Sequence, residues 1–360
     1  MSPMTEESQI RKWLELAAAN GASDLHLVPG HNPTQRLHGE LVELDATPCE
    51  SEFVRAGLLA LCDADQAKQF QQTKNIDFAL QTTIDGVPQR YRANYFVTGE
   101  SLSACFRIIP STIPDFEWTG FPRELADRLA HLRNGLVLIT GVTGAGKTTT
   151  LAMIINMLNR EGGYRIITAE DPIEYVFPRY QNSIVTQREV GRDIQSFADG
   201  LKYGLRQDPD VILVGEIRDQ ETAQMALSAA ETGHLVFSTL HTRDAKGAVS
   251  RFTDLFRPAT QPEVRSQLAM ALRAVVSQHL LPGTTEEKRQ LALEVMINTN
   301  PVASAIRTGK LESIDTGIVT GRADGMISLD ESIRRLVRDG NISRATAERY
   351  LTDATILNRR

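Results

Sequence analysis

The first third of the chain carries apolar residues first at helical spacing and then at every second position. A helical stripe at i, i+3, i+4 and i+7 consists of Ile10, Trp13, Leu14 and Ala17. It predicts an amphipathic helix that ends near Asn20. Alternating patterns predict the strands of an antiparallel meander at Ile76–Thr83, Arg90–Val97 and Leu102–Ile109. Residues 1–110 are therefore expected to form a small α+β domain.

The pattern changes beyond a proline-rich stretch. Residues 111–122 and the preceding Pro110 include three prolines and a glycine, which predicts a semi-rigid linker. Continuous apolar runs follow at Leu136–Thr140, Arg165–Thr168, Val211–Val214 and Leu235–Thr239. Such strands are buried on both faces and alternate here with helical stretches, so residues 123–360 are expected to form an α/β domain with a parallel, doubly wound sheet. From about residue 262 to residue 360 we expect a mostly helical C-terminal part.

Composition narrows the classes of protein that this pattern allows. The length of 360 residues suits two domains. Acidic residues outnumber basic ones by 45 to 39, and this net charge of −6 argues against a broad nucleic-acid surface. The three cysteines lie far apart and form no pair of the kind that a structural zinc site needs. No apolar run reaches the roughly 18 residues of a membrane span, so we expect a cytoplasmic protein.

One segment predicts nucleotide binding. Gly141–Thr148 matches the G-x-x-x-x-G-K-[ST] pattern of a phosphate-binding loop (P-loop), between an apolar strand and a helix. Backbone N–H groups of such a loop and of the following helix bind phosphate oxygens. Lys147 would bridge the β- and γ-phosphates of ATP, and the Thr148 hydroxyl would bind Mg²⁺. The residues expected to bind the nucleotide are Gly141, Thr143, Gly144, Ala145, Gly146, Lys147, Thr148 and Thr149.

A carboxylate follows the apolar strand Val211–Val214. P-loop enzymes place an acidic residue at the end of the strand beside the loop, where it holds Mg²⁺ or orients the attacking water. Here Gly215 stands where many such strands carry aspartate, and Glu216 comes next. Glu216 is therefore better placed to polarise water than to bind the metal. The alternative is that Glu216 is only an acidic residue before the next helix.

Two further groups of polar residues lie at strand ends. Glu170, Asp171 and Glu174 place three carboxylates within five residues, more than a turn needs, and Glu170 is a candidate for contact with Mg²⁺, direct or indirect. His234 and His241 flank the strand Leu235–Thr239. Phosphate sensing and a structural role both remain open for this pair. Ligands of such folds bind at the carboxyl ends of strands, which favours His241 for direct contact.

Three arginines in the first domain have two interpretations. Arg90 and Arg92 share one face of a strand, and Arg107 lies on the next strand. They are either surface residues in weak ion pairs or arginine fingers that a separate domain brings to ATP.

The motifs, in this order, resemble those of one family, the type IV pilus retraction ATPases (PilT type) of the bacterial type II/IV secretion ATPases. Besides the P-loop, the matching segments are Ala22–Leu27, Arg90–Asn94, Cys105–Pro110, Glu170–Glu174, Gln187–Val190, Asp208–Asp219 and Ala230–Thr242. The resemblance implies a homohexamer whose subunits join a PAS-like N-terminal domain to a RecA-like P-loop ATPase domain, with ATP and Mg²⁺ between them.

The resemblance also implies roles for the candidate residues. Glu216 is the general base, Glu170 and Glu174 support metal and water, His234 and His241 sense the γ-phosphate, and positive charge comes from Arg90, Arg92 and Arg107. The implied partner is a pilus platform protein in the inner membrane, with a second retraction or assembly ATPase as a further one. The protein would work in the cytoplasm at the pilus base, without nucleic acid and without inserting into the membrane.

Two other functions stay open at this stage. A related secretion or conjugation ATPase would power transport rather than retraction, and a P-loop enzyme of another class would act on nucleic acid or small molecules. The length and the absence of a four-cysteine zinc motif favour the retraction branch of the family. The stretch Pro301–Arg307 matches the retraction element of the family only loosely, and Arg243 stands where a small residue is usual.

Overall fold

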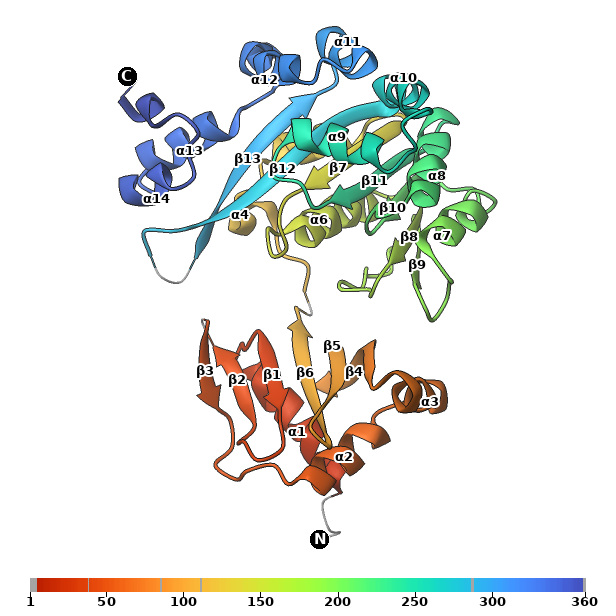
Figure 1. The fold of residues 1–360 in the computed structure, drawn as a ribbon, viewed down its shortest axis with the longest axis vertical. Helices are drawn as coiled ribbons and strands as arrows, with labels where there is room; N and C mark the ends of the chain where they lie inside the picture. Colours follow the sequence, from red (N-terminus) through yellow and green to blue (C-terminus); the bar gives the residue numbers. More distant parts are fainter. Residues whose placement is uncertain (1–4, 38, 85, 111, 286–287, 359–360) are drawn as a thin grey trace. The chain divides into compact units, whose positions relative to one another are not determined.

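The computed structural model describes residues 5–37, 39–84, 86–110, 112–285 and 288–358, and the chain divides into two compact units (Figure 1). The first unit comprises the residues up to Thr112 together with the short segment Pro172–Val176. The second comprises Ile113–Asp171 and the chain from Phe177 onward. Most residues of the predicted linker thus group with the second unit, and they include a one-turn helix, α4 (Phe116–Thr119), which the proline pattern did not predict.

The first unit is built on a six-stranded antiparallel sheet with the order β3-β2-β1-β6-β5-β4. Its strands are β1 (Asp24–Leu27), β2 (Thr34–Leu37), β3 (Glu40–Glu43), β4 (Asn75–Ile84), β5 (Val87–Thr98) and β6 (Ser101–Ile109). Its helices are α1 (Glu6–Ala19), α2 (Ser51–Ala60) and α3 (Ala64–Thr73). The predicted meander is confirmed as β4, β5 and β6, and the predicted first helix as α1. The PAS-like character of this unit stays a prediction.

One face of this sheet holds the core and the other presents the arginines. On β5, Tyr91 and Tyr95 are fully buried and pack with Phe106 of β6. Side chains alternate along a strand, so Arg90, Arg92 and Asn94 point to the face opposite the tyrosines. Arg92 lies directly opposite Arg107 in the register of β5 and β6. The shared face of the arginines, predicted from their spacing, is confirmed.

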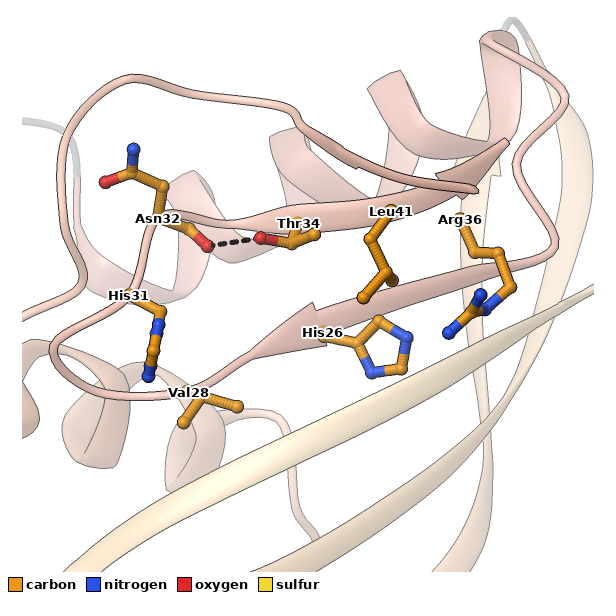
Figure 2. A pocket seen from close by; sticks show the side chains of 7 residues that line it. All are labelled: His26, Val28, His31, Asn32, Thr34, Arg36 and Leu41. Atoms are coloured by element: carbon orange, nitrogen blue, oxygen red, sulfur yellow. Dashed lines mark hydrogen bonds between the residues drawn. The ribbon is translucent and has the colours of Figure 1, made fainter. Parts of the chain in front are cut away.

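A hollow of about 270 Å³ opens beside β1 and β2 of the first unit (Figure 2). Its lining consists of His26, Val28, His31, Asn32, Thr34, Arg36 and Leu41. The Thr34 hydroxyl donates a hydrogen bond to the Asn32 carbonyl oxygen over 2.8 Å. Burial lowers the pKa of His26, and the charge of Arg36 lowers it further. The hollow contains none of the residues that the sequence assigns to ATP.

The second unit is built on a seven-stranded sheet with the order β13-β12-β7-β11-β10-β8-β9. The strands are β7 (Gly135–Thr140), β8 (Arg165–Glu170), β9 (Ile184–Glu189), β10 (Val211–Val214), β11 (Leu235–Leu240), β12 (Leu272–Pro282) and β13 (Arg289–Ile297). All neighbours pair in parallel except β12 and β13, which are antiparallel. The α/β class is confirmed, and the sheet is parallel with one antiparallel edge strand.

Helices surround this sheet because its central strands are buried on both faces. Every residue of β7, β10 and β11 is buried. The helices are α5 (Arg123–Ala130), α6 (Lys147–Glu161), α7 (Phe197–Gly204), α8 (Gln220–Glu231), α9 (Ala245–Asp254), α10 (Gln261–Ala271), α11 (Asn300–Thr308), α12 (Glu312–Thr320), α13 (Leu329–Arg338) and α14 (Arg344–Glu348), with short 3₁₀ turns at Gly321–Asp324 and Ala354–Asn358. Among the helices that the structure describes, none has the length and apolar content to span a membrane.

The prediction of a mostly helical C-terminal part is wrong for residues 272–297. Two long strands, β12 and β13, occupy this region and extend the main sheet beside β7. The reason lies in the burial of β12, where five consecutive residues, Ala274–Gln278, are buried. A strand buried on both faces shows no alternation of apolar and polar residues, so its period cannot distinguish it from a buried helix. The helices α11 to α14 follow only after these strands.

Candidate nucleotide site

The P-loop connects the end of β7 to the start of α6. Gly146 caps α6 in the left-handed conformation, with φ of 85°, and no side chain accepts a hydrogen bond at this cap. The first backbone N–H groups of a helix have no partner within the helix, and the helix dipole adds partial positive charge there. This end of α6 therefore suits an anion, and the residues present fit the phosphates of a nucleotide.

Lys147 lies buried at the first position of α6. Its Nζ donates hydrogen bonds to the carbonyl oxygens of Gly141, over 2.9 Å, and of Val142, over 3.2 Å. The ammonium group is thus held over the loop that the sequence assigns to phosphate. The other predicted nucleotide residues follow the same turn: Ala145 is buried, Thr148 and Thr149 are half-buried, and Thr143 and Gly144 are exposed.

Position 141 requires glycine because of both its backbone conformation and its close neighbours. Its φ is 144°, and a Cβ atom there would lie 2.6 Å from the carbonyl oxygen of Gln278 on β12. No side chain fits between these two backbones, so the loop can pass this close to β12 only with glycine.

Replacing Gly141 by Ala should weaken ATP binding. Overpacking at a tight site costs about 1–3 kcal/mol, so the Kd for ATP should rise by about tenfold or more. The measurement is nucleotide binding by calorimetry. Gly163→Ala is the control, because Gly163 also has a positive φ, of 84°, but open space around it. Equal affinities for the two variants would show that the contact with β12 does not shape the loop.

Glu216 follows β10 and forms the centre of a charged cluster. Arg218 Nη2 lies 2.8 Å from Glu216 Oε2, and His241 Nε2 lies 3.1 Å from Glu216 Oε1. Burial alone would raise the pKa of Glu216, but the hydrogen bond from Arg218 and the charge of His241 outweigh it, and the pKa lies below its ordinary value. Glu216 is therefore ionised at neutral pH. A carboxylate of this kind can orient a water molecule and accept a hydrogen bond from it.

Glu170 ends β8 as a buried carboxylate. Its Oε1 accepts hydrogen bonds from the Thr168 hydroxyl, over 2.6 Å, and from Gln187 Nε2, over 3.0 Å. These donors come from β8 itself and from β9, so both strands orient the same carboxylate. An oriented carboxylate at this edge of the sheet fits a role beside a hard cation such as Mg²⁺.

Gly215 lies where the backbones of β10 and β8 approach closely. Its N–H donates to the Ala169 carbonyl oxygen over 2.8 Å. A Cβ atom at this position would lie 3.3 Å from that oxygen and 3.3 Å from the ring of Phe197. A side chain here would require these neighbours to shift by a few tenths of an ångström, and the acidic residue stands one position later.

Parallel strands bring most of these groups to one edge of the sheet. The P-loop follows β7, Glu170 ends β8, Glu216 follows β10 and His241 follows β11. In the parallel register, Leu240 of β11 lies beside Thr140 of β7, the last residue before the P-loop. Ligands of open α/β sheets bind at this edge. Within the second unit, the predicted site is therefore assembled from four separate strands.

Comparison with known proteins identifies the family. The model of the family described as "Type II/IV secretion system protein" matches residues 4–355. The chain belongs to this family.

Relatives of known name are similar over most of the chain. It is 40% identical over 338 residues to the type IV pilus retraction ATPase PilT of Pseudomonas aeruginosa, covering 94% of this chain and 96% of that protein. It is 41% identical over 317 residues to a twitching motility protein of Neisseria gonorrhoeae, covering 88% and 83%. A crystal structure of the pilus retraction motor PilT with bound ADP has a TM-score of 0.86 at 37% identity, covering 99% of both chains.

One predicted residue of this type II/IV secretion family member lies away from the edge. His234 precedes β11, so it stands at the opposite end of the strand from His241. Its Nδ1 lies 3.1 Å from the Ala229 carbonyl oxygen, at the end of α8. The two ends of a strand belong to opposite edges of a parallel sheet, so a single copy does not bring both histidines to one phosphate. Within one copy, the fold therefore does not bring His234 and His241 together at the γ-phosphate, as the resemblance implied.

Four other predicted residues belong to the first unit. Glu174 lies in the segment Pro172–Val176 and is half-buried. Arg107 Nε lies 3.0 Å from Asp24 Oδ1, and Arg92 Nε lies 3.6 Å from Asp77 Oδ1. Arg90 is half-buried on the same face. These ion pairs do not decide between the two interpretations of the arginines, which stay predictions.

The sequence did not indicate three further residues of this edge. Arg218 pairs with Glu216 and also lies 4.0 Å from Asp171, and it could have been singled out because it stands two positions after Glu216. Gln187 was part of a matching segment but had no assigned role. Gln278 lies against the P-loop, and the expectation of helix over β12 concealed it.

Proposed function

We propose that this chain is an ATPase that drives retraction of a type IV pilus, and that it works as a homohexamer. The observation that supports this most is the combination of a P-loop and an oriented Glu216 in a chain similar over nearly its full length to PilT. A secretion or conjugation ATPase that powers transport is the alternative.

The P-loop binds the phosphates of ATP in this proposal. The N–H groups at the start of α6 contact the phosphate oxygens, and Lys147 exchanges its contacts with the loop carbonyls for the β- and γ-phosphates. Thr148 and Glu170 would hold Mg²⁺, directly or through water. The bound ion would neutralise charge on the β- and γ-phosphates.

Glu216 orients the water that attacks the γ-phosphate. Its lowered pKa keeps it ionised, and Arg218 and His241 hold its two oxygens in place. His241 faces the same edge and would sense the γ-phosphate. Arg90, Arg92 and Arg107 would supply positive charge from the first unit of the same or a neighbouring subunit. Because phosphoryl transfer depends mainly on positioning and charge, these contacts suffice for hydrolysis.

The expected partner is a platform protein of the inner membrane at the base of the pilus. The decisive experiment deletes the gene and restores it with the wild-type chain or with Glu216→Gln. Deletion should abolish twitching while pili accumulate on the cell surface, and only the wild-type chain should restore movement. Loss of surface pili would indicate assembly instead. Normal twitching with impaired secretion would favour the transport alternative.

A further inference from the structure

The segment that carries His241 is anchored to the rest of the second unit before α9 begins. His241 follows β11, and α9 starts four residues later at Ala245. In between, His279 Nε2 of β12 lies 2.8 Å from the Arg243 carbonyl oxygen. A carbonyl only accepts, so this nitrogen donates the hydrogen bond. The segment is thereby attached to the strand that also lies against the P-loop.

A buried carboxylate provides a second attachment. Glu294 of β13 accepts a hydrogen bond on Oε1 from the Ala245 N–H over 2.7 Å, at the first residue of α9. This carboxylate thus binds the N-terminus of α9, where the helix dipole favours negative charge.

Charged residues of α9 and α12 pair with one another, and one of them, Asp315, is near enough to Glu294 to affect its pKa. The second residue of α9, Lys246, pairs with Asp315 over 2.8 Å and with Glu312 over 3.0 Å, both on α12. Burial, together with the nearby charges of Asp244 and Asp315, raises the pKa of Glu294 to about 7 against the lowering effect of the Ala245 hydrogen bond. On β12, Ser277 lies opposite Glu294 in the register and His279 lies opposite Ala292. Glu294 can therefore change its charge near neutral pH.

We propose that Glu294 is a positioning residue, which holds His241 against Glu216 through its hydrogen bond to the first turn of α9. When Glu294 is ionised, the hydrogen bond that it accepts from the Ala245 N–H is charge-assisted and stronger than the bond to a neutral acid. The protonated form keeps only weaker contacts and gives α9 more freedom. The three residues between Ala245 and His241 transmit the difference to His241. The expected effect of Glu294 on turnover rests on the proposed ATPase activity. Its expected effect on α9 does not.

The first test is hydrogen exchange of the whole chain between pH 6 and pH 8. After correction for the intrinsic pH dependence, protection of the amides at 244–247 should increase as Glu294 ionises. In Glu294→Gln this increase should disappear. An unchanged pH dependence in the variant would overturn the proposal, whether or not the protein hydrolyses ATP.

Thermal stability supplies a second readout with a defined sign. Burial raises the pKa of Glu294 in the folded chain above its ordinary value of 4.5, so the global stability it contributes is present below pH 4.5 and is lost as the pH rises through about 7. The local hydrogen bond to Ala245 works in the opposite direction, because it is stronger with the ionised form. Glu294→Gln does not titrate. The difference in Tm, variant minus wild type, should therefore increase from pH 5 to pH 8. A constant difference would contradict the ionisation of Glu294 in this range.

The third test is the pH profile of turnover at saturating ATP. Wild-type kcat should increase from pH 6 to pH 8. The kcat of Glu294→Gln should be about tenfold below wild type at pH 8 and close to wild type at pH 6. Asp315→Asn, which removes a charge that raises the pKa, should shift the increase to lower pH. Glu312→Gln, the other partner of Lys246, should leave the profile in place. Parallel profiles for wild type and Glu294→Gln would overturn the positioning role, whereas an inactive wild-type chain would overturn the proposed function alone.

Discussion

Glu216→Gln is expected to bind ATP with nearly unchanged affinity and to lose about 10²–10⁴-fold in kcat. The amide can keep one hydrogen bond to Arg218 or His241, so the site keeps its shape. It cannot supply the negative charge that orients and deprotonates the attacking water. The measurement combines binding of ATP by calorimetry with steady-state phosphate release.

Glu231→Gln is the matched control for this variant. Glu231 is exposed at the end of α8, away from the edge that carries Glu216, so its substitution should leave both binding and turnover near wild type. Preserved turnover in Glu216→Gln would remove Glu216 as the base. Loss of ATP binding together with turnover would mean that the carboxylate instead supports the structure of the site.

Arg107→Ala should reduce turnover at saturating ATP by about 10³–10⁵-fold if Arg107 acts as an arginine finger. The Arg107 side chain is 63% exposed, and its buried partner Asp24 keeps a hydrogen bond from the Ser23 hydroxyl when Arg107 is removed. The variant should therefore fold normally, with a Tm close to wild type. Circular dichroism and ATPase activity, measured on the same preparation, separate the two effects.

The ion-pair interpretation makes the opposite prediction, and Asp24→Asn distinguishes them. This substitution breaks the pair but leaves the guanidinium in place. An arginine that serves ATP should survive the loss of Asp24, with turnover near wild type. If both variants lose activity equally, the pair orients the strand β1 against β6, and Arg107 has no direct role at the phosphates.

The sequence predicts best those features that local patterns determine. The P-loop motif and the strand before it are contiguous, and continuous apolar runs predicted β7, β8, β10 and β11. Helix α3 was missed because Phe70 is its only buried residue, so it shows no apolar stripe. It is stabilised instead by a capping box between Asp63 and Gln66.

The arrangement of strands in space could not be predicted in the same way. β7 lies between β12 and β11, which are far from it in sequence, and no periodic pattern encodes this order. For this reason the sequence predicted only that His241 and Glu216 lie at the same edge of the sheet. It did not predict that they contact each other. Because the strand order was unknown, the contact of Gln278 with Gly141 and the separation of His234 from the P-loop could not be predicted either.

Lys147 has a consequence for the rate of a working cycle. Its ammonium group has two carbonyl partners within its own loop, so a phosphate gains only the difference between two sets of hydrogen bonds. The same exchange favours departure, because the lysine regains those partners as soon as ADP leaves. In an enzyme that must release its product in every cycle, such a lysine limits the affinity for ADP. ADP therefore leaves sooner, and the next ATP can bind.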